Sequence, residues 1–178
     1  LESCLKEYQK SNELLLNDSD LFEVFSSSQI TKQYELSFEE IEDSIVDGGQ
    51  DGGIDSFIII VDNRVLSNQE DLEDFNFCQN TSVELLIGQS KFTNSFQETV
   101  IDKLIVSTPD IYNLELKENN LSVKFNPKIV EKILLFHEAW KKATIKKAKI
   151  KINYFYACKA NEIEVNSSFK AKIQQLIA

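Results

Sequence analysis

The chain has 178 residues, 42 % of them hydrophobic and 27 % charged, which is the composition of one soluble globular domain and excludes a fibrous or disordered protein. No stretch approaches the roughly 20 apolar residues of a membrane span, and no signal-peptide pattern stands at the start. The three cysteines lie far apart in the sequence, which argues against a disulfide framework or a zinc site and indicates a reducing cytoplasm.

The net charge of −10 is divided unevenly along the chain. Residues 1–80 carry 4 basic and 19 acidic side chains, whereas residues 81–178 carry 15 basic and 10 acidic ones. We therefore expect a face that binds phosphate groups on the second half. The total charge predicts weak nonspecific affinity for duplex DNA, because such binding depends on neutralising phosphates.

The first quarter of the chain predicts three helices. Apolar residues at helical spacing indicate one helix over residues 5–16 and a second that begins near Ser19 and contains Glu23. The sequence Ser-Phe-Glu-Glu at 37–40 is a capping box and predicts a short third helix that runs to about Val46.

Four of the five glycines fall between Asp47 and Asp55. Such crowding indicates backbone conformations that side chains forbid, or a close approach of other groups. The order of acids and glycines does not fit the calcium loop of an EF-hand. A β-roll calcium motif is also excluded, because such a motif recurs along a sequence and this one occurs once. Asp55 is the expected metal ligand in this loop, Asp51 is an alternative ligand, and Asp47 is expected at the end of the preceding helix.

Strands are predicted next. Residues 57–61 are apolar on both faces, which is typical of a central strand in a covered sheet. Residues 64–66 are expected to return as a short strand, and the polar residues 67–81 predict an exposed loop. Residues 83–91 then predict a strand with a polar end.

Beyond this strand, residues 95–98 form a second capping box that predicts a helix, which Pro109 is expected to end or interrupt. Residues 121–125 alternate in polarity and predict a short edge strand or an extended linker.

Asn126 and Pro127 place a cap residue and a proline at the start of a long helix. The only histidine, His137, and the only tryptophan, Trp140, lie in that helix and are expected to be structural. A core strand over residues 150–157 and a helix over 169–177 complete the chain.

The candidate site follows from strand geometry. Side chains alternate faces along a strand, so Gln89 and Lys91 point the same way. If the strands at 57–61 and 83–91 are antiparallel neighbours, Asp55 lies beside the end that carries them. Carboxylate and amide oxygens are hard ligands that suit Mg²⁺, and a lysine beside such a metal can orient or help deprotonate a water molecule.

This pattern resembles the PD-(D/E)XK nucleases in the variant where glutamine replaces the acid of the last motif. Mrr-type restriction endonucleases show a similar G-x-D…Q-x-K signature. The chain is most similar to the N-terminal domain of abortive-infection phage-resistance (AIPR) proteins, over roughly residues 21–104. The matching pieces are Ser-Phe-Glu-Glu-Ile-Glu at 37–42, Val-Asp-Gly-Gly-Gln-Asp-Gly-Gly-Ile-Asp at 46–55, Ile-Gly-Gln-Ser-Lys at 87–91 and Ser-Phe-Gln-Glu at 95–98.

The resemblance implies an α/β fold with a restriction-endonuclease-like αβββαβ core, in which a mixed central sheet is flanked by helices. It implies Mg²⁺ or Mn²⁺ bound by Glu23, Asp55 and Gln89, with Lys91 positioning the attacking water. Another acid on the third helix is the alternative to Glu23; the candidates are Glu39, Glu42 and Asp43.

We expect residues 1–178 to form a single nuclease domain, the N-terminal part of a longer cytoplasmic protein. The implied activity is hydrolysis of phosphodiester bonds, in DNA rather than RNA, in bacterial phage defence. The expected partners are nucleic acid, the remainder of the same protein and further copies of the chain, with no membrane. Two alternatives stay open: a catalytically silent module of the same fold that binds nucleic acid or a partner protein, and an oligomerisation domain.

Overall fold

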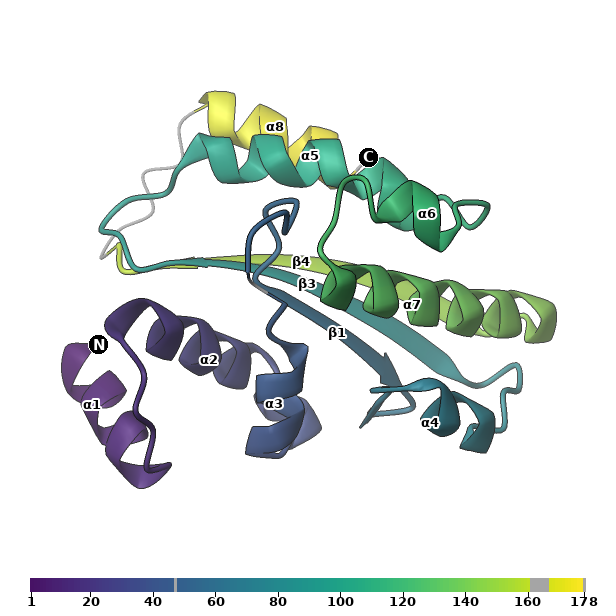
Figure 1. Ribbon diagram of the computed structural model, residues 1–178, viewed down its shortest axis with the longest axis horizontal. Coiled ribbons are helices and arrows are strands. Elements are labelled where there is room, and N and C mark those ends of the chain that lie inside the picture. The colour runs from purple at the N-terminus through teal and green to yellow at the C-terminus, as the bar shows by residue number, and fades with distance from the viewer. Residues whose placement is uncertain (47, 161–166, 178) are drawn as a thin grey trace.

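The computed structural model describes residues 1–46, 48–160 and 167–177 (Figure 1). The fold is mixed α/β, with a four-stranded sheet in the order β2-β1-β3-β4. β1 is antiparallel to β2 and to β3, whereas β3 and β4 are parallel. The bounds of the strands are β1 Ser56–Val61, β2 Arg64–Val65, β3 Ser82–Lys91 and β4 Lys149–Cys158.

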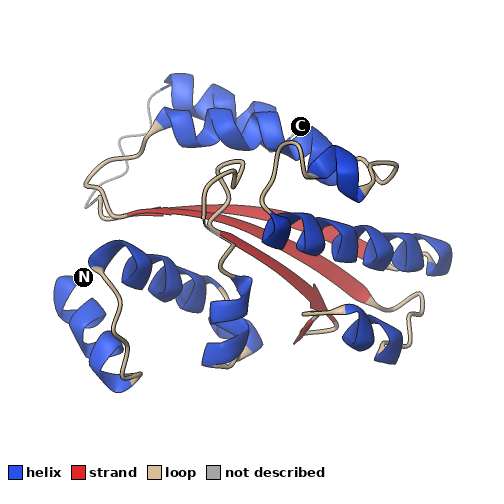
Figure 2. Cartoon of the chain, in the orientation of Figure 1, coloured by secondary structure: helices blue, strands red, loops and turns tan. Residues whose placement is uncertain are grey.

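Helices flank the sheet on both sides (Figure 2). The N-terminal helices lie on one face, where α2 packs against β3 and α3 packs against β1. On the other face α7 packs against β1, β3 and β4, and α5 packs against α8. The helix bounds are α1 Glu2–Ser11, α2 Asp18–Ile30, η1 Lys32–Tyr34, α3 Phe38–Ser44, α4 Gln69–Asp74, α5 Glu98–Tyr112, α6 Glu118–Leu121, α7 Pro127–Lys146 and α8 Ser167–Ile177.

The alternation of side chains along the two central strands divides the core between the faces. Phe57 and Ile59 of β1 and Ile87 of β3 belong to the larger cluster, which α5 and α7 complete. Ile58 and Leu86 point to the other face and pack with residues from the N-terminal half. Every residue of β1 is buried, which confirms the prediction of a central strand covered on both faces.

Two predicted helix starts are confirmed. The Ser37 hydroxyl accepts a bond from the Glu40 N–H at 3.2 Å, and the Glu40 carboxylate accepts one from the Ser37 N–H at 2.7 Å. The Asn126 side chain accepts the Ile129 N–H at 3.0 Å, with Pro127 at the first helical position. These caps satisfy backbone groups that have no partner within the helix.

Several local predictions are wrong. Residues 67–81 are not a plain exposed loop, because they contain α4, whose Leu72 is fully buried. Residues 121–125 do not form a strand: the Phe125 N–H bonds to the Leu121 carbonyl at 2.9 Å in a turn after α6, and both side chains are buried. Buried apolar residues that are spaced irregularly among polar ones give no periodic signal.

The capping box predicted at 95–98 is also absent, since α5 begins at Glu98 and its N-cap, Gln97, makes no side-chain cap bond. Pro109 does not end this helix, which continues to Tyr112. The first helix ends at Ser11, earlier than predicted, and leaves Leu15 fully exposed. Asp47, predicted at a helix end, lies outside the described residues.

The predicted strand at 150–157 is confirmed as β4, but it lies at the edge of the sheet and its residues are half-exposed or exposed. Among the described residues, no helix combines the length and the apolar character needed to cross a membrane.

Candidate functional site

The glycine-rich loop is held between α5 and the start of α7 (Figure 1). The Asn126 side-chain amide donates to the carbonyls of Val46 and Gly49 at 2.9 and 3.2 Å, and the Asn126 N–H donates to the Gln50 carbonyl at 2.9 Å. On the other side, the Ser107 hydroxyl donates to the Gly52 carbonyl at 2.7 Å. The loop therefore has a fixed path into β1.

Gly53 is a position in this loop where an added side chain would clash with helix α5. Its φ is +83°, and a Cβ added there would lie 2.7 Å from Cβ of Lys103 and 3.6 Å from Oε1 of Gln89. The Asp51 carboxylate accepts the Gly53 N–H at 2.7 Å, which gives Asp51 a structural role in the turn. Gly53 therefore lets the backbone pass close against α5.

The sheet register brings Asp55 to Gln89. Ser56 pairs with Gly88 in the antiparallel ladder, and the Asp55 N–H extends the pairing to the Gly88 carbonyl at 2.8 Å. Oδ2 of Asp55 accepts a bond from the Ser90 N–H at 2.7 Å and another from Nε2 of Gln89. The meeting of acid and amide expected from the sequence is thus present, with both side chains buried, at 3 % and 2 % exposure.

The orientation of the Gln89 amide matters for chemistry. Its Nε2 donates to Asp55, which leaves Oε1 facing the Gly53 backbone. A carboxylate oxygen only accepts, so the amide must present its nitrogen to Asp55 when no cation lies between them. The oxygen, which is the atom a hard cation uses, is outside this bond.

Lys91 follows Gln89 by two residues on β3 and shares its face, the face of Ile87 and the larger core cluster. Its residue is half-buried, whereas Gln89 is fully buried. Lys91 therefore lies closer to solvent than Gln89 on this face of β3, where its ammonium can reach a bound anion.

Glu23 is buried, with 7 % exposure, in α2, the helix that packs against β3 from the opposite face to α5. The alternative helix acids lie on α3, where Asp43 forms an ion pair with Lys132 of α7. The helix of Glu23 therefore lies across the sheet from the face that carries Gln89 and Lys91, and Glu23 stays a prediction as the third ligand, whereas Asp43 is used in holding α7.

Two neighbours of the site were missed by the sequence reasoning. Tyr156 pairs with Gln89 in the register of β3 and β4, and its hydroxyl accepts the Gln97 N–H at 3.0 Å. Burial raises the pKa of the Tyr156 phenol, and the charge of Asp55 adds to this increase. Only the pairing of β4 with β3 reveals this neighbour, and no short motif marks it.

Lys103 is the second missed residue. Its stem packs over Gly53, and the residue is exposed beside a hollow of about 470 Å³ lined by the loop and α5. No ion pair of Lys103 occurs within the described residues. Its stem therefore reaches the glycine loop above Gln89 from a helix whose sequence spacing does not predict this contact.

The described residues contain no group of three histidine, cysteine, aspartate or glutamate side chains that could hold a metal ion. The candidate set of Glu23, Asp55 and Gln89 contains only two such residues. A carboxylate beside an amide oxygen nevertheless has the ligand chemistry of Mg²⁺, which keeps several of its own water molecules.

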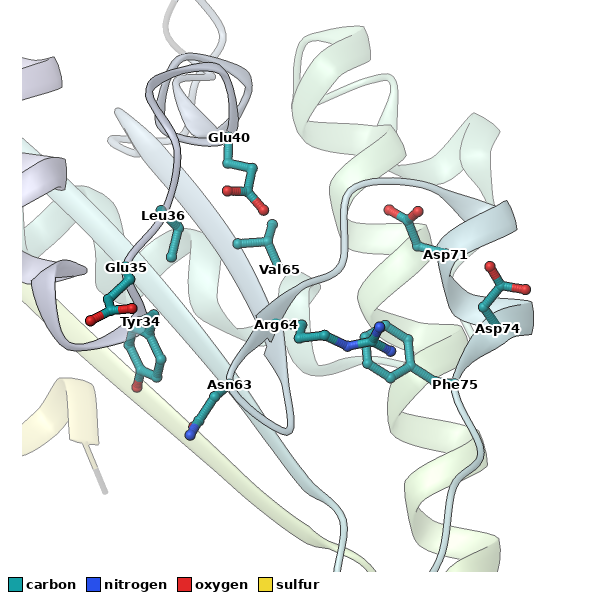
Figure 3. Close-up of a pocket in the computed structure, with 10 residues that line it drawn as sticks. All are labelled: Tyr34, Glu35, Leu36, Glu40, Asn63, Arg64, Val65, Asp71, Asp74 and Phe75. Atoms are coloured by element: carbon teal, nitrogen blue, oxygen red, sulfur yellow. The ribbon is translucent and has the colours of Figure 1, made fainter.

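A separate hollow of about 300 Å³ lies at the opposite end of β1, around the turn to β2 (Figure 3). The guanidinium of Arg64 lies 4.3 Å from the centre of the Phe75 ring there. Two of its acids, Glu40 and Asp71, already cap helices α3 and α4. This hollow is therefore accounted for by local structure.

His137 is fully buried, and its Nε2 lies 2.8 Å from the Ile111 carbonyl. Burial lowers the pKa of the imidazole, so it is neutral at pH 7 and Nε2–H donates to that carbonyl. This contact joins α7 to α5 and explains the residue without a role in the site.

Comparison of the chain with protein-family models, with curated proteins and with solved structures found no match.

Proposed function

We propose that this protein is a Mg²⁺- or Mn²⁺-dependent nuclease, similar in its active site to the PD-(D/E)XK enzymes and to the N-terminal domain of AIPR phage-defence proteins. The observation that carries the proposal is the bond between the Gln89 amide and the Asp55 carboxylate, with Lys91 next on the same face of β3. The order of β1, β2 and β3, followed by helices and β4, supports a restriction-endonuclease-like αβββαβ core.

Asp55 and the Gln89 amide oxygen would hold the cation, with Glu23 as the third protein ligand. A bound divalent cation polarises the scissile phosphate and lowers the pKa of a coordinated water. Gln89 has to turn its amide by half a rotation so that Oε1, now facing Gly53, points to the cation. Lys91 orients the attacking water and offsets the charge that develops on the phosphate.

Replacement of an acid by glutamine leaves the site with one negative charge fewer than the common nuclease set. Cation affinity is therefore expected to be modest and to rise when a phosphate supplies further oxygens. Because Asp55 and Gln89 are nearly inaccessible, substrate binding must also open the contact between the glycine loop and α5.

The test is a nuclease assay on single-stranded DNA, duplex DNA and RNA with Mn²⁺, Mg²⁺ or EDTA. The wild-type chain should cleave at least one substrate only with a divalent cation. Lys91→Gln should lose cleavage and keep its melting temperature, since Lys91 is only half-buried. Lys128→Ala, an exposed lysine of α7, is the matched control and should cleave like the wild type.

A catalytically silent module of the same fold is the second candidate. The burial of Asp55 and Gln89 and the net charge of −10 favour it. Absence of cleavage under every condition, together with nucleic acid or protein binding that Lys91→Gln does not alter, would replace the nuclease by this module.

A further inference from the structure

β4 is the last strand in the order of the sheet, and no other strand of the described residues pairs with its outer side. The Lys149 N–H donates to the Thr81 carbonyl at 3.0 Å, and the Lys159 N–H donates to the Thr93 carbonyl at 2.8 Å. Odd-numbered residues of β4 thus turn their backbone N–H and C=O groups toward β3. The backbone groups of the even-numbered residues, from Ile150 to Cys158, point away from the sheet.

Helix α8 lies beside this edge, behind α5 on the same face of the sheet (Figure 1). A hollow of about 570 Å³ is bounded by α5, β4 and α8. Its lining is mainly apolar and includes Ile152 and Tyr154 of β4 and Ile173 and Ile177 of α8. Ile177 is 59 % exposed, so the lining of the hollow on the α8 side reaches solvent.

The two faces of the sheet beside β4 differ in charge. β4 and α8 together contain four lysines and no acid, in a chain of net charge −10. Lys151 pairs with Glu84 on the face opposite α8, so Lys149 lies on that face too. Within the described residues, Lys149 and Lys170 form no ion pair.

We propose that an extended segment of a partner protein adds to β4 as a fifth strand, in the groove between β4 and α8. Side chains of an added strand alternate between the two faces. Those on the α8 face meet the apolar hollow, and those on the other face meet the lysines at the start of β4. The groove therefore selects a segment in which apolar residues alternate with aspartate or glutamate.

A second copy of this chain fits the groove less well. Two antiparallel copies of β4 would place the start of each strand, with Lys149 and Lys151, beside the end of the other, which carries no acid to pair with them. The hollow also needs apolar side chains from a strand that is not itself flanked by a helix, whereas the β4 of a second copy would arrive with its own α8.

The experiment is selection of a displayed library of random ten-residue peptides on the immobilised chain, followed by affinity measurement on the enriched peptides. We expect enriched sequences that alternate apolar and acidic residues. Ile152→Pro removes an outward N–H of β4 without touching the ladder to β3, and it should weaken binding about tenfold or more.

The double variant Lys149→Glu, Lys151→Glu covers the case in which the proline variant does not fold. Both lysines are exposed, so this variant should fold normally and prefer peptides with lysine or arginine in place of the acids. Failure to enrich peptides, or enriched peptides whose affinity and charge preference neither variant changes, would overturn the proposal. Sedimentation that shows a wild-type dimer broken by Ile152→Pro would assign the edge to a second copy instead.

Discussion

The carboxylate of Asp55 accepts a hydrogen bond from the backbone N–H of Ser90, with 2.7 Å between Oδ2 and the nitrogen. This bond ties the entry of β1 to the end of β3, next to the contact with the Gln89 side chain. The proposed metal ligand is therefore also a structural residue, and substitutions at Asp55 must separate the two roles.

Asp55→Ala should destabilise the fold by about 2–6 kcal/mol, because it leaves the buried donors of Ser90 and Gln89 without this acceptor, at about 1–3 kcal/mol each. Asp55→Asn should cost much less, since its side-chain oxygen, placed where Oδ2 lies, still accepts from both Ser90 and Gln89. Urea unfolding of the two variants checks this order. Equal loss of stability in both would show that the charge, and not the acceptor, holds the strands.

Gly53→Ala should destabilise the protein more than Gly49→Ala. Both glycines have φ near +80°, but only at Gly53 does an added Cβ meet another atom within 4 Å, the stem of Lys103 at 2.7 Å. The shared backbone strain is about 1–2 kcal/mol, and the steric clash adds to it at Gly53 alone. Thermal unfolding measures both variants, and equal melting temperatures would contradict the packing described for this loop.

Acid should weaken the contact between α5 and α7 through His137. Burial lowers the pKa of its imidazole below the usual value of about 6.5, so the unfolded chain binds a proton more readily than the folded one. This contribution to stability is present above pH 6.5 and is lost as the pH falls below that value toward the folded pKa. The free energy of unfolding, measured from pH 7.5 to 5, should fall less steeply in His137→Gln than in the wild type. Parallel curves would show that His137 does not titrate in this range.

Lys132 and Asp43 offer a test of how α3 is held to α7. The Lys132 side chain is 7 % exposed and the Asp43 side chain is 47 % exposed. Asp43→Ala leaves the buried ammonium with only the weak contact to the Ser67 carbonyl at 3.5 Å, and it should cost about 1–2 kcal/mol. Lys132→Met keeps the packing of the stem and removes the charge, so its cost should be smaller. The reverse order in guanidinium unfolding would contradict the dominance of the buried ammonium.

The sequence predicts the centre of this fold better than its periphery. The apolar run at β1 and the alternation along β3 contain enough information to place Asp55 beside Gln89, because antiparallel pairing and a two-residue period leave little freedom. The helix caps at Ser37 and Asn126 can be predicted equally well, because each depends only on residues within one helical turn.

Long-range packing explains what could not be predicted. Leu72 and Phe125 are buried by partners distant in the sequence, so no local period marks them. Lys103 and Tyr156 reach the neighbourhood of Gln89 only because α5 crosses the glycine loop and β4 pairs in parallel with β3. The face from which α2 brings Glu23 depends on the crossing of the chain, which single-sequence patterns do not encode.

The central claim is that the end of β3 and the entry of β1 form a divalent-cation site. Isothermal titration of the wild-type chain with Mn²⁺, with and without a single-stranded oligonucleotide, tests it most directly, with Asp55→Asn as the folded variant that lacks the charge. The account predicts one Mn²⁺ site that the oligonucleotide strengthens and that Asp55→Asn loses. Binding of equal strength in both proteins, or no binding with the oligonucleotide present, would contradict it.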